Sequence, residues 1–208
     1  MATVKEFLDL IKSKVEIHAG YVWAAQGEIL TRELFDKFVS IHGRSRYYLT
    51  NTSAEKWIGR QVFDCSGLIV WTLQQLGILN KSQDYTASGL YYYLCDFIIK
   101  DELKPGDLVF SGNNGITHVG VYAGNNKVYH ARGTFYGVVE TNLFSSFNKF
   151  GRLKCLKEEY KVAEHWAEKY WKFLNENGVI VHDKRFDDKI TRAEVMTLLA
   201  RIKGIKED

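Results

Sequence analysis

The chain has 208 residues, of which 46% are hydrophobic and 25% charged, and its formal net charge is +3. This composition is typical of a folded globular protein and excludes a disordered chain. The charge is too small for a nucleic-acid-binding surface, and no apolar run approaches the length that spans a membrane.

The first part of the chain is predicted to be helical. Apolar residues at helical spacing indicate an amphipathic helix over about residues 4–15, and Thr31 caps a second helix that ends at Gly43. The apolar residues expected on the inner face of this second helix are Leu34, Phe35, Phe38 and Ile41. Residues 44–60 lack a clear period and are predicted to be irregular surface structure. A third helix is predicted to begin at Cys65.

The second part of the chain is predicted to form strands. Residues 82–103 are a mixed stretch, in which Tyr91–Tyr93 are expected to pack in the core rather than to form a sugar-stacking surface. After the turn at Pro105 and Gly106, short segments rich in Val and Tyr are separated by Gly or Asn. These segments are Asp107–Ser111, His118–Ala123, Lys127–Ala131 and Gly137–Thr141. With a last strand at 151–156, helices followed by an antiparallel sheet predict an α+β fold.

The C-terminal residues differ in kind and are predicted to form a small helical module at 162–208. One helix covers about residues 163–175, and a capping box at 191–194 opens a final helix. The charged segment at 157–161 is typical of a connector, so the first domain is expected to cover residues 1–156.

The cysteines and the N-terminal segment bound the cellular context. Cys65, Cys95 and Cys155 are odd in number and show no paired spacing, which argues against a disulfide framework and against a CxxC zinc site. We therefore expect no metal and no other cofactor. The first 15 residues carry acidic side chains and lack a long apolar core, so we expect synthesis in the cytoplasm without a signal peptide.

Three residues of this chain predict nucleophilic catalysis. Cys65 lies at a predicted helix N-terminus, where backbone N–H groups and the helix dipole favour a thiolate, so we expect a thiol more acidic than a free one. His118 and His130 lie 12 residues apart on strands joined at Gly124, so they can be neighbours. A cysteine, a histidine that takes its proton and a second histidine that orients the first form a thiol-hydrolase site. The alternative is a small buried cysteine and two structural histidines.

Four segments of the chain resemble, in the same order, the motifs of the NlpC-type cell-wall peptidases over about residues 15–145. These segments are Phe63–Leu68, Leu103–Phe110, Thr117–Tyr122 and Val128–Ala131. The resemblance implies a papain-like fold with N-terminal helices on a five- to six-stranded antiparallel sheet. It implies Cys65 as the nucleophile, His118 as the general base and His130 as the residue that orients His118. The residues that it assigns to the oxyanion or the substrate are Tyr21, Asp64 and Ser66.

The resemblance also implies an activity. Members of this family are cysteine endopeptidases that cut peptidoglycan stem peptides, usually between γ-D-glutamate and diaminopimelate or lysine. Three alternatives remain open for this chain: an N-acetylmuramoyl-L-alanine amidase on the same core, a catalytically silent wall-binding or phage structural protein, and a zinc hydrolase with Cys and His ligands.

The sequence departs from the family pattern in two places. Ala24 and Ala25 stand where a Gly-Gly pair is usual, which is expected to narrow the approach to the site. Roughly 37 residues separate Gln26 from Asp64 where the family has a short link. This insertion, at about residues 28–60, is either a lid or specificity wall or a surface helix without a role.

The C-terminal residues resemble a single S-layer homology repeat, which implies binding to cell-wall polysaccharide, with Arg192 as the candidate contact. Dimerisation through this module is the alternative, because one repeat needs neighbours to bury its apolar face. A wall-binding module without a signal peptide favours action at the bacterial cell wall after phage-type release. A bacterial autolysin with an unrecorded leader is expected to carry the same domains.

Overall fold

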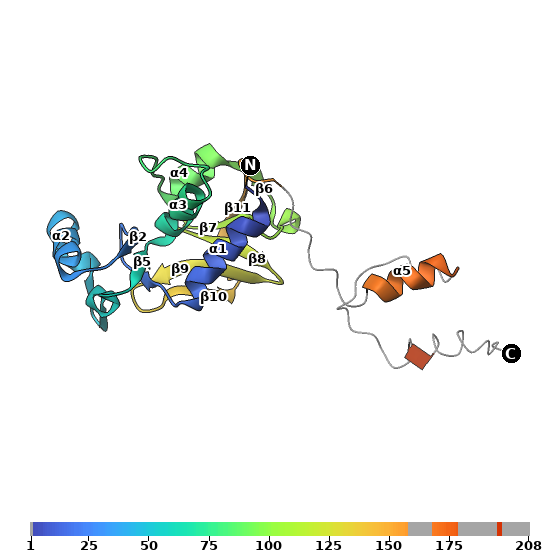
Figure 1. The fold of residues 1–208 in the computed structure, drawn as a ribbon, viewed down its shortest axis with the longest axis horizontal. Helices are drawn as coiled ribbons and strands as arrows, with labels where there is room; N and C mark the ends of the chain where they lie inside the picture. Colours follow the sequence, from blue (N-terminus) through green and yellow to red (C-terminus); the bar gives the residue numbers. More distant parts are fainter. Residues whose placement is uncertain (1, 158–167, 179–194, 197–208) are drawn as a thin grey trace. The chain divides into compact units, whose positions relative to one another are not determined.

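The computed structural model describes residues 2–157, 168–178 and 195–196 of the chain (Figure 1). The chain divides near residue 160 into two compact units. Helix α5 (Glu168–Glu176) belongs to the second unit, and residues 195–196 there are helical. The predicted capping box and Arg192 lie outside the described residues, as does most of the segment that resembles an S-layer homology repeat.

The first unit is built on a six-stranded antiparallel sheet with the spatial order β10-β9-β8-β7-β11-β6. Its strands are β6 (Cys95–Ile98), β7 (Leu108–Ser111), β8 (His118–Gly124), β9 (Lys127–Gly133), β10 (Gly137–Asn142) and β11 (Phe147–Leu153). The predicted antiparallel sheet is therefore confirmed. The last strand begins at Phe147 and not at residue 151, and β6 is a strand within the stretch predicted as mixed.

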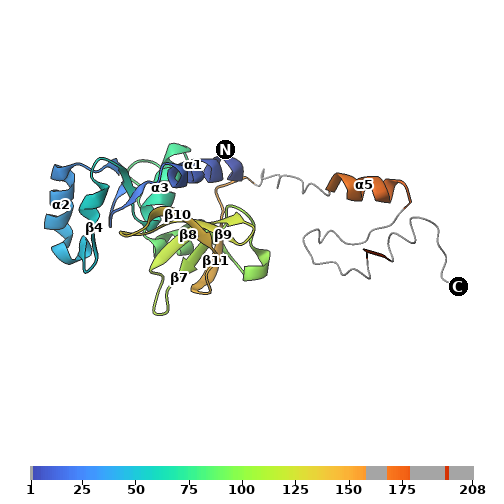
Figure 2. The same ribbon diagram turned by 90° about the horizontal axis from the view of Figure 1, so that it is seen from below.

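Two helices lie on the same side of this sheet, α1 (Val4–Glu16) and α3 (Cys65–Gln75), as Figures 1 and 2 show. The apolar residues of α1 that are buried are Val4, Phe7, Leu8 and Ile11. They join α3 and the inward side chains of the sheet in the main core. Burial of such a side chain contributes about 1.5–3 kcal/mol. The apolar spacing that predicts the first helix thus also fixes which of its faces meets the sheet.

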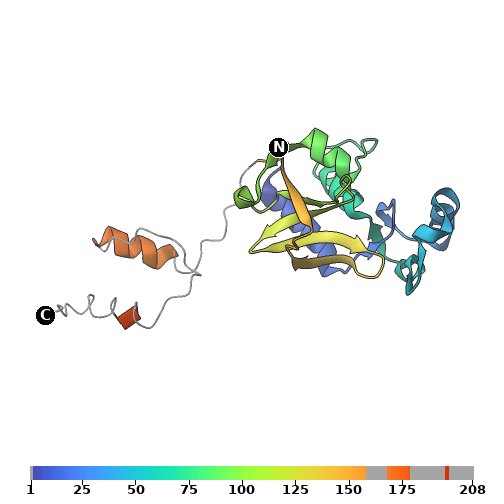
Figure 3. The ribbon, with the colours of Figure 1, turned by 180° about the vertical axis from the view of Figure 1, so that it is seen from behind.

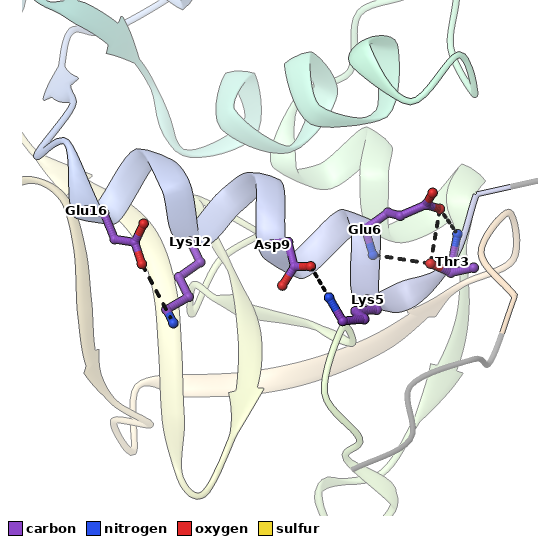
Figure 4. Close-up of polar contacts among 6 residues, drawn as sticks. All are labelled: Thr3, Lys5, Glu6, Asp9, Lys12 and Glu16. Atoms are coloured by element: carbon purple, nitrogen blue, oxygen red, sulfur yellow. Dashed lines mark hydrogen bonds and ion pairs between the residues drawn. The ribbon is translucent and has the colours of Figure 1, made fainter. Parts of the chain in front are cut away.

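The polar side of α1 carries its cap and two ion pairs (Figure 4). Thr3 accepts a hydrogen bond from the Glu6 N–H, and the Glu6 carboxylate accepts one from the Thr3 N–H. On the exposed face of the helix, Lys5 pairs with Asp9 and Lys12 pairs with Glu16, and the two members of each pair are about one helical turn apart. Exposed pairs of this spacing add only a few tenths of a kcal/mol each, so the buried stripe holds α1 in place.

The opposite side of the sheet has its own small apolar cluster. Figure 3 shows this side, with the yellow and orange strands in front of the blue helix α1. The buried residues of the cluster are Val109, Val128, Phe147 and Phe150. They come from β7, β9 and β11, so neighbouring strands are held together by side chains as well as by backbone hydrogen bonds.

The turn that precedes β7 has two structural roles. Gly106 has a φ of +94°, and a Cβ there would lie 2.5 Å from Val4 of α1, so this close approach requires glycine. Asp107 is 2% exposed, and both its carboxylate oxygens accept hydrogen bonds from Arg152 of β11, each at 2.8 Å. The Lys104 N–H donates to the same carboxylate at 2.7 Å. This buried ion pair ties the start of β7 to β11.

The insertion has a core of its own. It contains β2 (Gln26–Ile29), α2 (Arg32–His42) and the hairpin of β3 (Tyr48–Leu49) and β4 (Thr52–Ser53). The Thr31 side chain caps α2 as predicted, accepting from the Leu34 N–H. The residues buried around it are Val22, Ala25, Leu30, Phe35, Tyr47, Ala54, Trp57 and Val62. Ile41, which was predicted on the inner face of the helix, is 60% exposed, because this core covers little more than one turn.

Trp57 connects the insertion to the rest of the unit. Its indole N–H donates to the Thr134 carbonyl at 2.8 Å, and a Cβ at Gly20 or Gly137 would lie within 2.8 Å of its ring. The three-stranded sheet β1-β5-β2 joins the two parts, with β1 (Gly20–Tyr21) parallel to β5 (Gln61–Phe63). The prediction of irregular surface structure at 44–60 is therefore wrong, because that stretch supplies the buried aromatic side chains of Tyr47 and Trp57.

The tyrosines at 91–93 are more exposed than predicted. Residues 87–94 form helix α4 (Ala87–Gly89) and a π-helical turn before β6. Tyr91 is half-buried and stacks on Phe97 with ring centroids 4.5 Å apart. Tyr92 is 58% and Tyr93 73% exposed, so the prediction that all three tyrosines pack in the core is wrong for these two. The inward side of this turn is taken by Leu90, which is fully buried, with Tyr91 packed at its edge.

Candidate active site

Cys65 is the first residue of α3, directly after β5. Asp64 is the N-cap of this helix, and its Oδ1 accepts a hydrogen bond from the Gly67 N–H at 2.7 Å. A Cβ at Gly67 would lie 2.2 Å from the Ala25 carbonyl oxygen, so the helix start fits against the preceding loop only with glycine at this position. Asp64 is therefore explained as the cap of α3, and Gly67 is explained by its close approach to the loop.

The Asp64 carboxylate also holds the loop in front of the site. Its Oδ2 accepts from the Ala24 N–H at 3.0 Å, and the Asp64 N–H donates to the Ala25 carbonyl at 2.8 Å. The Ser66 hydroxyl donates to Asp64 Oδ1 at 3.1 Å. Burial raises the pKa of Asp64, and these hydrogen bonds oppose the increase. Of the two residues predicted to recognise substrate, Ser66 thus bonds to Asp64 and Asp64 bonds to the loop, a role that sequence reasoning missed.

The same loop shows what the Ala24–Ala25 departure means. Ala24 has a φ of +67°, in the left-handed region where glycine is favoured. The glycine usual at this position therefore has a conformational reason, and this chain accepts strain instead. The hydrogen bond from Ala24 to Asp64 keeps the loop in this conformation.

The sulfur of Cys65 faces backbone donors. The N–H groups of Val119, Ser66 and Cys65 itself interact favourably with it and lower its pKa. Cys65 is nevertheless half-buried at the contact of α3 with the sheet, and burial raises the pKa of its thiol to about 12. The expectation of an unusually acidic thiol is therefore wrong for this cysteine taken alone, because loss of hydration outweighs the helix N-terminus.

The two histidines meet across β8 and β9. His118 Nε2 lies 2.8 Å from His130 Nδ1, and their rings are inclined at 63°. Gly120 lies beside them on β8, and a Cβ there would lie 3.1 Å from the His130 Cβ. This glycine leaves the room in which the His130 side chain stands, so the sequence His-Val-Gly is explained by packing.

Both histidines are neutral at physiological pH. Burial lowers the pKa of His118 to about 4, and it lowers that of His130 to about 3 with help from the neighbouring His118 charge. Val119, whose N–H faces the Cys65 sulfur, directly follows His118 in β8. The thiol and a neutral imidazole are thus presented by adjoining segments. Proton transfer from the thiol to the imidazole would create a thiolate and an imidazolium, and such opposite charges stabilise each other when they lie close together.

Thr141, on β10, is a polar partner of His130 that sequence reasoning missed. Its Oγ1 lies 3.2 Å from His130 Nε2, and its hydroxyl donates to the Asn142 carbonyl at 3.0 Å. Val139 pairs with His130 across β9 and β10, so Thr141 is the next residue on the same face of β10. The alternation of the strand was visible in the sequence, but the register that brings Thr141 to the histidine was not.

Tyr21 lies close to the nucleophile. It pairs with Phe63 between β1 and β5, and negative charge on Cys65 or Asp64 would oppose ionisation of its hydroxyl. Burial, the larger cause, raises the pKa of Tyr21 well above its usual range. The phenol therefore stays protonated and remains a hydrogen-bond donor close to the candidate nucleophile.

Arg132 is a cation near the histidines that sequence reasoning also missed. Its positive charge contributes to the lowered pKa of both His118 and His130. The guanidinium carbon lies 3.9 Å from the ring centroid of Tyr136 and 5.3 Å from that of Phe144. These two rings hold the exposed side chain in place.

Among the described residues, no group of three His, Cys, Asp or Glu side chains is placed to hold a metal ion. Within the same residues, no helix has the length and apolar character needed to cross a membrane.

The chain is similar in sequence to known cell-wall peptidases. The sequence model of the NlpC/P60 family matches residues 45–173. The probable endopeptidase NlpC of Escherichia coli K12 is 37% identical over 117 residues, which cover 53% of this chain and 66% of that protein. The peptidoglycan endopeptidase RipA of Mycobacterium tuberculosis is 39% identical over 69 residues, 33% of this chain and 14% of RipA. The chain thus spans less than two thirds of either relative.

The fold has a solved counterpart. The structure of NlpC2 from Trichomonas vaginalis matches with a TM-score of 0.50 and 24% identity, over 74% of this chain and 47% of that one. At this identity the likeness concerns the fold alone. It agrees with the α+β papain-like arrangement expected from the sequence.

Proposed function

Because the chain belongs to the NlpC/P60 family, we propose that it is a cysteine endopeptidase that cleaves the stem peptides of peptidoglycan. One observation carries the proposal: the Cys65 sulfur at the start of α3 faces the N–H of Val119, and His118, the residue that precedes Val119 in β8, lies within hydrogen-bonding distance of His130. A cysteine, a neutral imidazole and a group that orients the imidazole are the parts that nucleophilic acyl transfer needs.

The proposed reaction uses these groups in order. His118 accepts the thiol proton as the Cys65 sulfur bonds to the carbonyl carbon of the scissile peptide. Backbone N–H groups at the start of α3 and the Tyr21 hydroxyl stabilise the oxyanion. His118 then gives its proton to the leaving amine as the carbon–nitrogen bond breaks. Water, deprotonated by His118, hydrolyses the thioester and releases a carboxylate and the free thiol.

The bond we propose is the one between γ-D-glutamate and diaminopimelate or lysine. The resemblance of the four sequence motifs supports this choice over the bond that an N-acetylmuramoyl-L-alanine amidase cleaves. The two activities give different products, because the endopeptidase exposes a new amine on diaminopimelate or lysine and the amidase exposes one on L-alanine.

Mass spectrometry of muropeptides after digestion of purified peptidoglycan tests both points. We expect new amino termini on diaminopimelate or lysine with the wild-type chain and none with Cys65→Ala, whose fold is checked by circular dichroism. Cys155→Ala is the matched control, because Cys155 is a half-buried cysteine after β11 and is expected to keep full activity. His118→Ala is expected to lose nearly as much activity as Cys65→Ala, and His130→Ala less.

Other outcomes of this digestion decide between the alternatives. New termini on L-alanine would replace the endopeptidase by an amidase, and no product from a folded wild-type chain would favour a catalytically silent wall-binding or phage structural protein. Stoichiometric zinc, with inhibition by a chelator but not by iodoacetamide, would favour a zinc hydrolase.

For the rest of the chain we propose residues 1–156 as the peptidase domain and 162–208 as a module that binds cell-wall polysaccharide. Cosedimentation of the full-length Cys65→Ala chain with purified walls tests the binding, and Arg192→Ala is expected to weaken it. Analytical ultracentrifugation tests the alternative of a homodimer. We also propose that the chain is synthesised in the cytoplasm and reaches the wall by phage-type release.

A further inference from the structure

A chain of hydrogen bonds runs from the backbone of β10 to the candidate base. The Asn142 carbonyl lies 3.0 Å from Thr141 Oγ1, which lies 3.2 Å from His130 Nε2. His130 Nδ1 in turn lies 2.8 Å from His118 Nε2. All three links are within hydrogen-bonding distance.

The direction of this chain is set at its backbone end. A carbonyl oxygen only accepts, so the Thr141 hydroxyl donates its single proton to Asn142. The threonine oxygen then offers His130 a lone pair, and His130 Nε2 carries the proton that occupies it. A neutral imidazole has one N–H, so His130 Nδ1 is bare and accepts from His118 Nε2.

The same rule applied to His118 selects its reactive nitrogen. With the proton on Nε2, Nδ1 of His118 carries a lone pair and is the nitrogen left for the thiol. If Thr141 donated to His130 instead, every proton in the chain would move by one place. His118 would then hold its proton on Nδ1, and this nitrogen would have no lone pair with which to accept the thiol proton.

We propose that Thr141 is a positioning residue, which relays the polarity of the Asn142 carbonyl through His130 and leaves Nδ1 of His118 bare to accept the Cys65 proton. The proposal deepens the peptidase function proposed above and rests on it for its role in catalysis. The tautomers themselves are a property of the resting protein and are measured without substrate.

The surroundings of His130 favour this arrangement. His130 is 2% exposed, so each of its ring nitrogens depends on a protein partner. His118 is the partner of Nδ1, and Thr141 is the partner of Nε2. The charged or titratable groups that bear on it are His118 from β8 and Arg132 from its own strand. Neither can take the place of Thr141 at Nε2, because His118 occupies Nδ1 and Arg132 has no acceptor.

The first experiment reads the tautomers directly. The full chain is labelled with ¹⁵N-histidine, two-bond ¹H–¹⁵N correlation spectra are recorded at pH 7, and signals are assigned with His118→Gln and His130→Gln. We expect both His118 and His130 to carry the proton on Nε2. A proton on Nδ1 of His118 in the wild-type chain would overturn the proposal.

The second experiment compares Thr141→Val with Thr141→Ser in the full chain. Valine keeps the branched shape and suits a strand but has no hydroxyl, whereas serine keeps the hydroxyl. We expect Thr141→Val to lose the single His118 tautomer, to slow alkylation of Cys65 by iodoacetamide and to lower kcat on peptidoglycan about tenfold with KM unchanged. Thr141→Ser is expected to restore the tautomer and most of the rate.

Two results of this comparison would refute the proposal. One is a folded Thr141→Val chain with wild-type tautomers, whatever its activity. The other is a serine variant that falls as far as the valine variant, because the hydroxyl would then not matter. If the expected tautomers are found while the wild-type chain digests no peptidoglycan, the hydrogen-bond chain stands and the proposed function fails.

Discussion

The pH dependence of Cys65 reactivity follows from the neutral state of the site. The pKa of His118 is about 4, against an ordinary value near 6.5, because its ring is buried. That of Cys65 is about 12 for the same reason. The pair therefore loses one proton near pH 4 and the next near pH 12. Between these limits His118 is free to accept the thiol proton, and the fraction of reactive ion pair is constant.

The protonated fraction of His118 at pH 5 distinguishes this site from one with an ordinary histidine. At pH 5 a histidine with a pKa of 4 is protonated in about one molecule in ten, whereas one with a pKa of 6.5 is protonated in about 97 of 100. The rate of Cys65 alkylation at pH 5 is thus expected to keep about 90% of its plateau value, instead of about 3%. A free thiol with a pKa near 8.5 would show no plateau and would react roughly tenfold faster for each pH unit between 6 and 8.

The assay is alkylation by iodoacetamide, quantified by mass spectrometry of the peptide that contains Cys65, with the Cys65→Ala chain as the blank. Arg132 provides the matched perturbation, because its positive charge opposes protonation of His118 and His130. Arg132→Ala is expected to raise the pKa of both and to move the acid limb to higher pH, and Arg132→Lys to leave it in place. A wild-type midpoint near pH 6.5, or a rate that climbs steadily through neutral pH, would refute this account of the site.

Three further predictions concern stability, measured by denaturant unfolding followed in the near-ultraviolet. Arg152→Ala is expected to cost about 3–5 kcal/mol, because it leaves the Asp107 carboxylate buried without its partner, and a loss below 1 kcal/mol would contradict this. Trp57→Ala is expected to cost a similar amount, about 3–5 kcal/mol, and a small loss would mean that the insertion docks by other contacts. Ala24→Gly is expected to stabilise the chain by about 0.5–1 kcal/mol, since it relieves a left-handed alanine, and destabilisation would show that the loop is not strained.

Much of the fold could be predicted because its signals are local. The apolar period of the first helix, the Thr31 cap and the Gly and Asn turns between strands each involve residues a few positions apart. Their structural counterparts are α1, α2 and the strands β7–β10. The misjudged stretches lack such signals. The burial of Tyr47 and Trp57 depends on a partner core brought together from distant segments, and no sequence period reports it.

In the candidate site, too, the sequence reveals the residues with local signals and not those that depend on tertiary structure. Cys65, His118 and His130 were chosen from residue type and motif, and their catalytic roles stay predictions, although the structure brings the histidines into contact. Thr141 could not be chosen, because only the register of β9 and β10 brings it to His130. Arg132 lies two residues after His130 on β9, but the burial that makes its charge bear on both histidines is not visible in the sequence. The acidity of Cys65 was judged from the helix N-terminus, which the sequence reveals, without the burial, which it does not.

The separate core of the insertion has a consequence for motion. Cooperative units of a protein open with their own free energies, and a small cluster with few links to its neighbours opens more readily than the layer beneath it. The links include the pairing of β2 with β5, the Trp57 indole and the hydrogen bond from Lys56 to the Phe135 carbonyl. Helix α2 itself buries only Phe35, whereas α3 buries six residues. Amide protons of α2 should therefore exchange with deuterium sooner than those of α3.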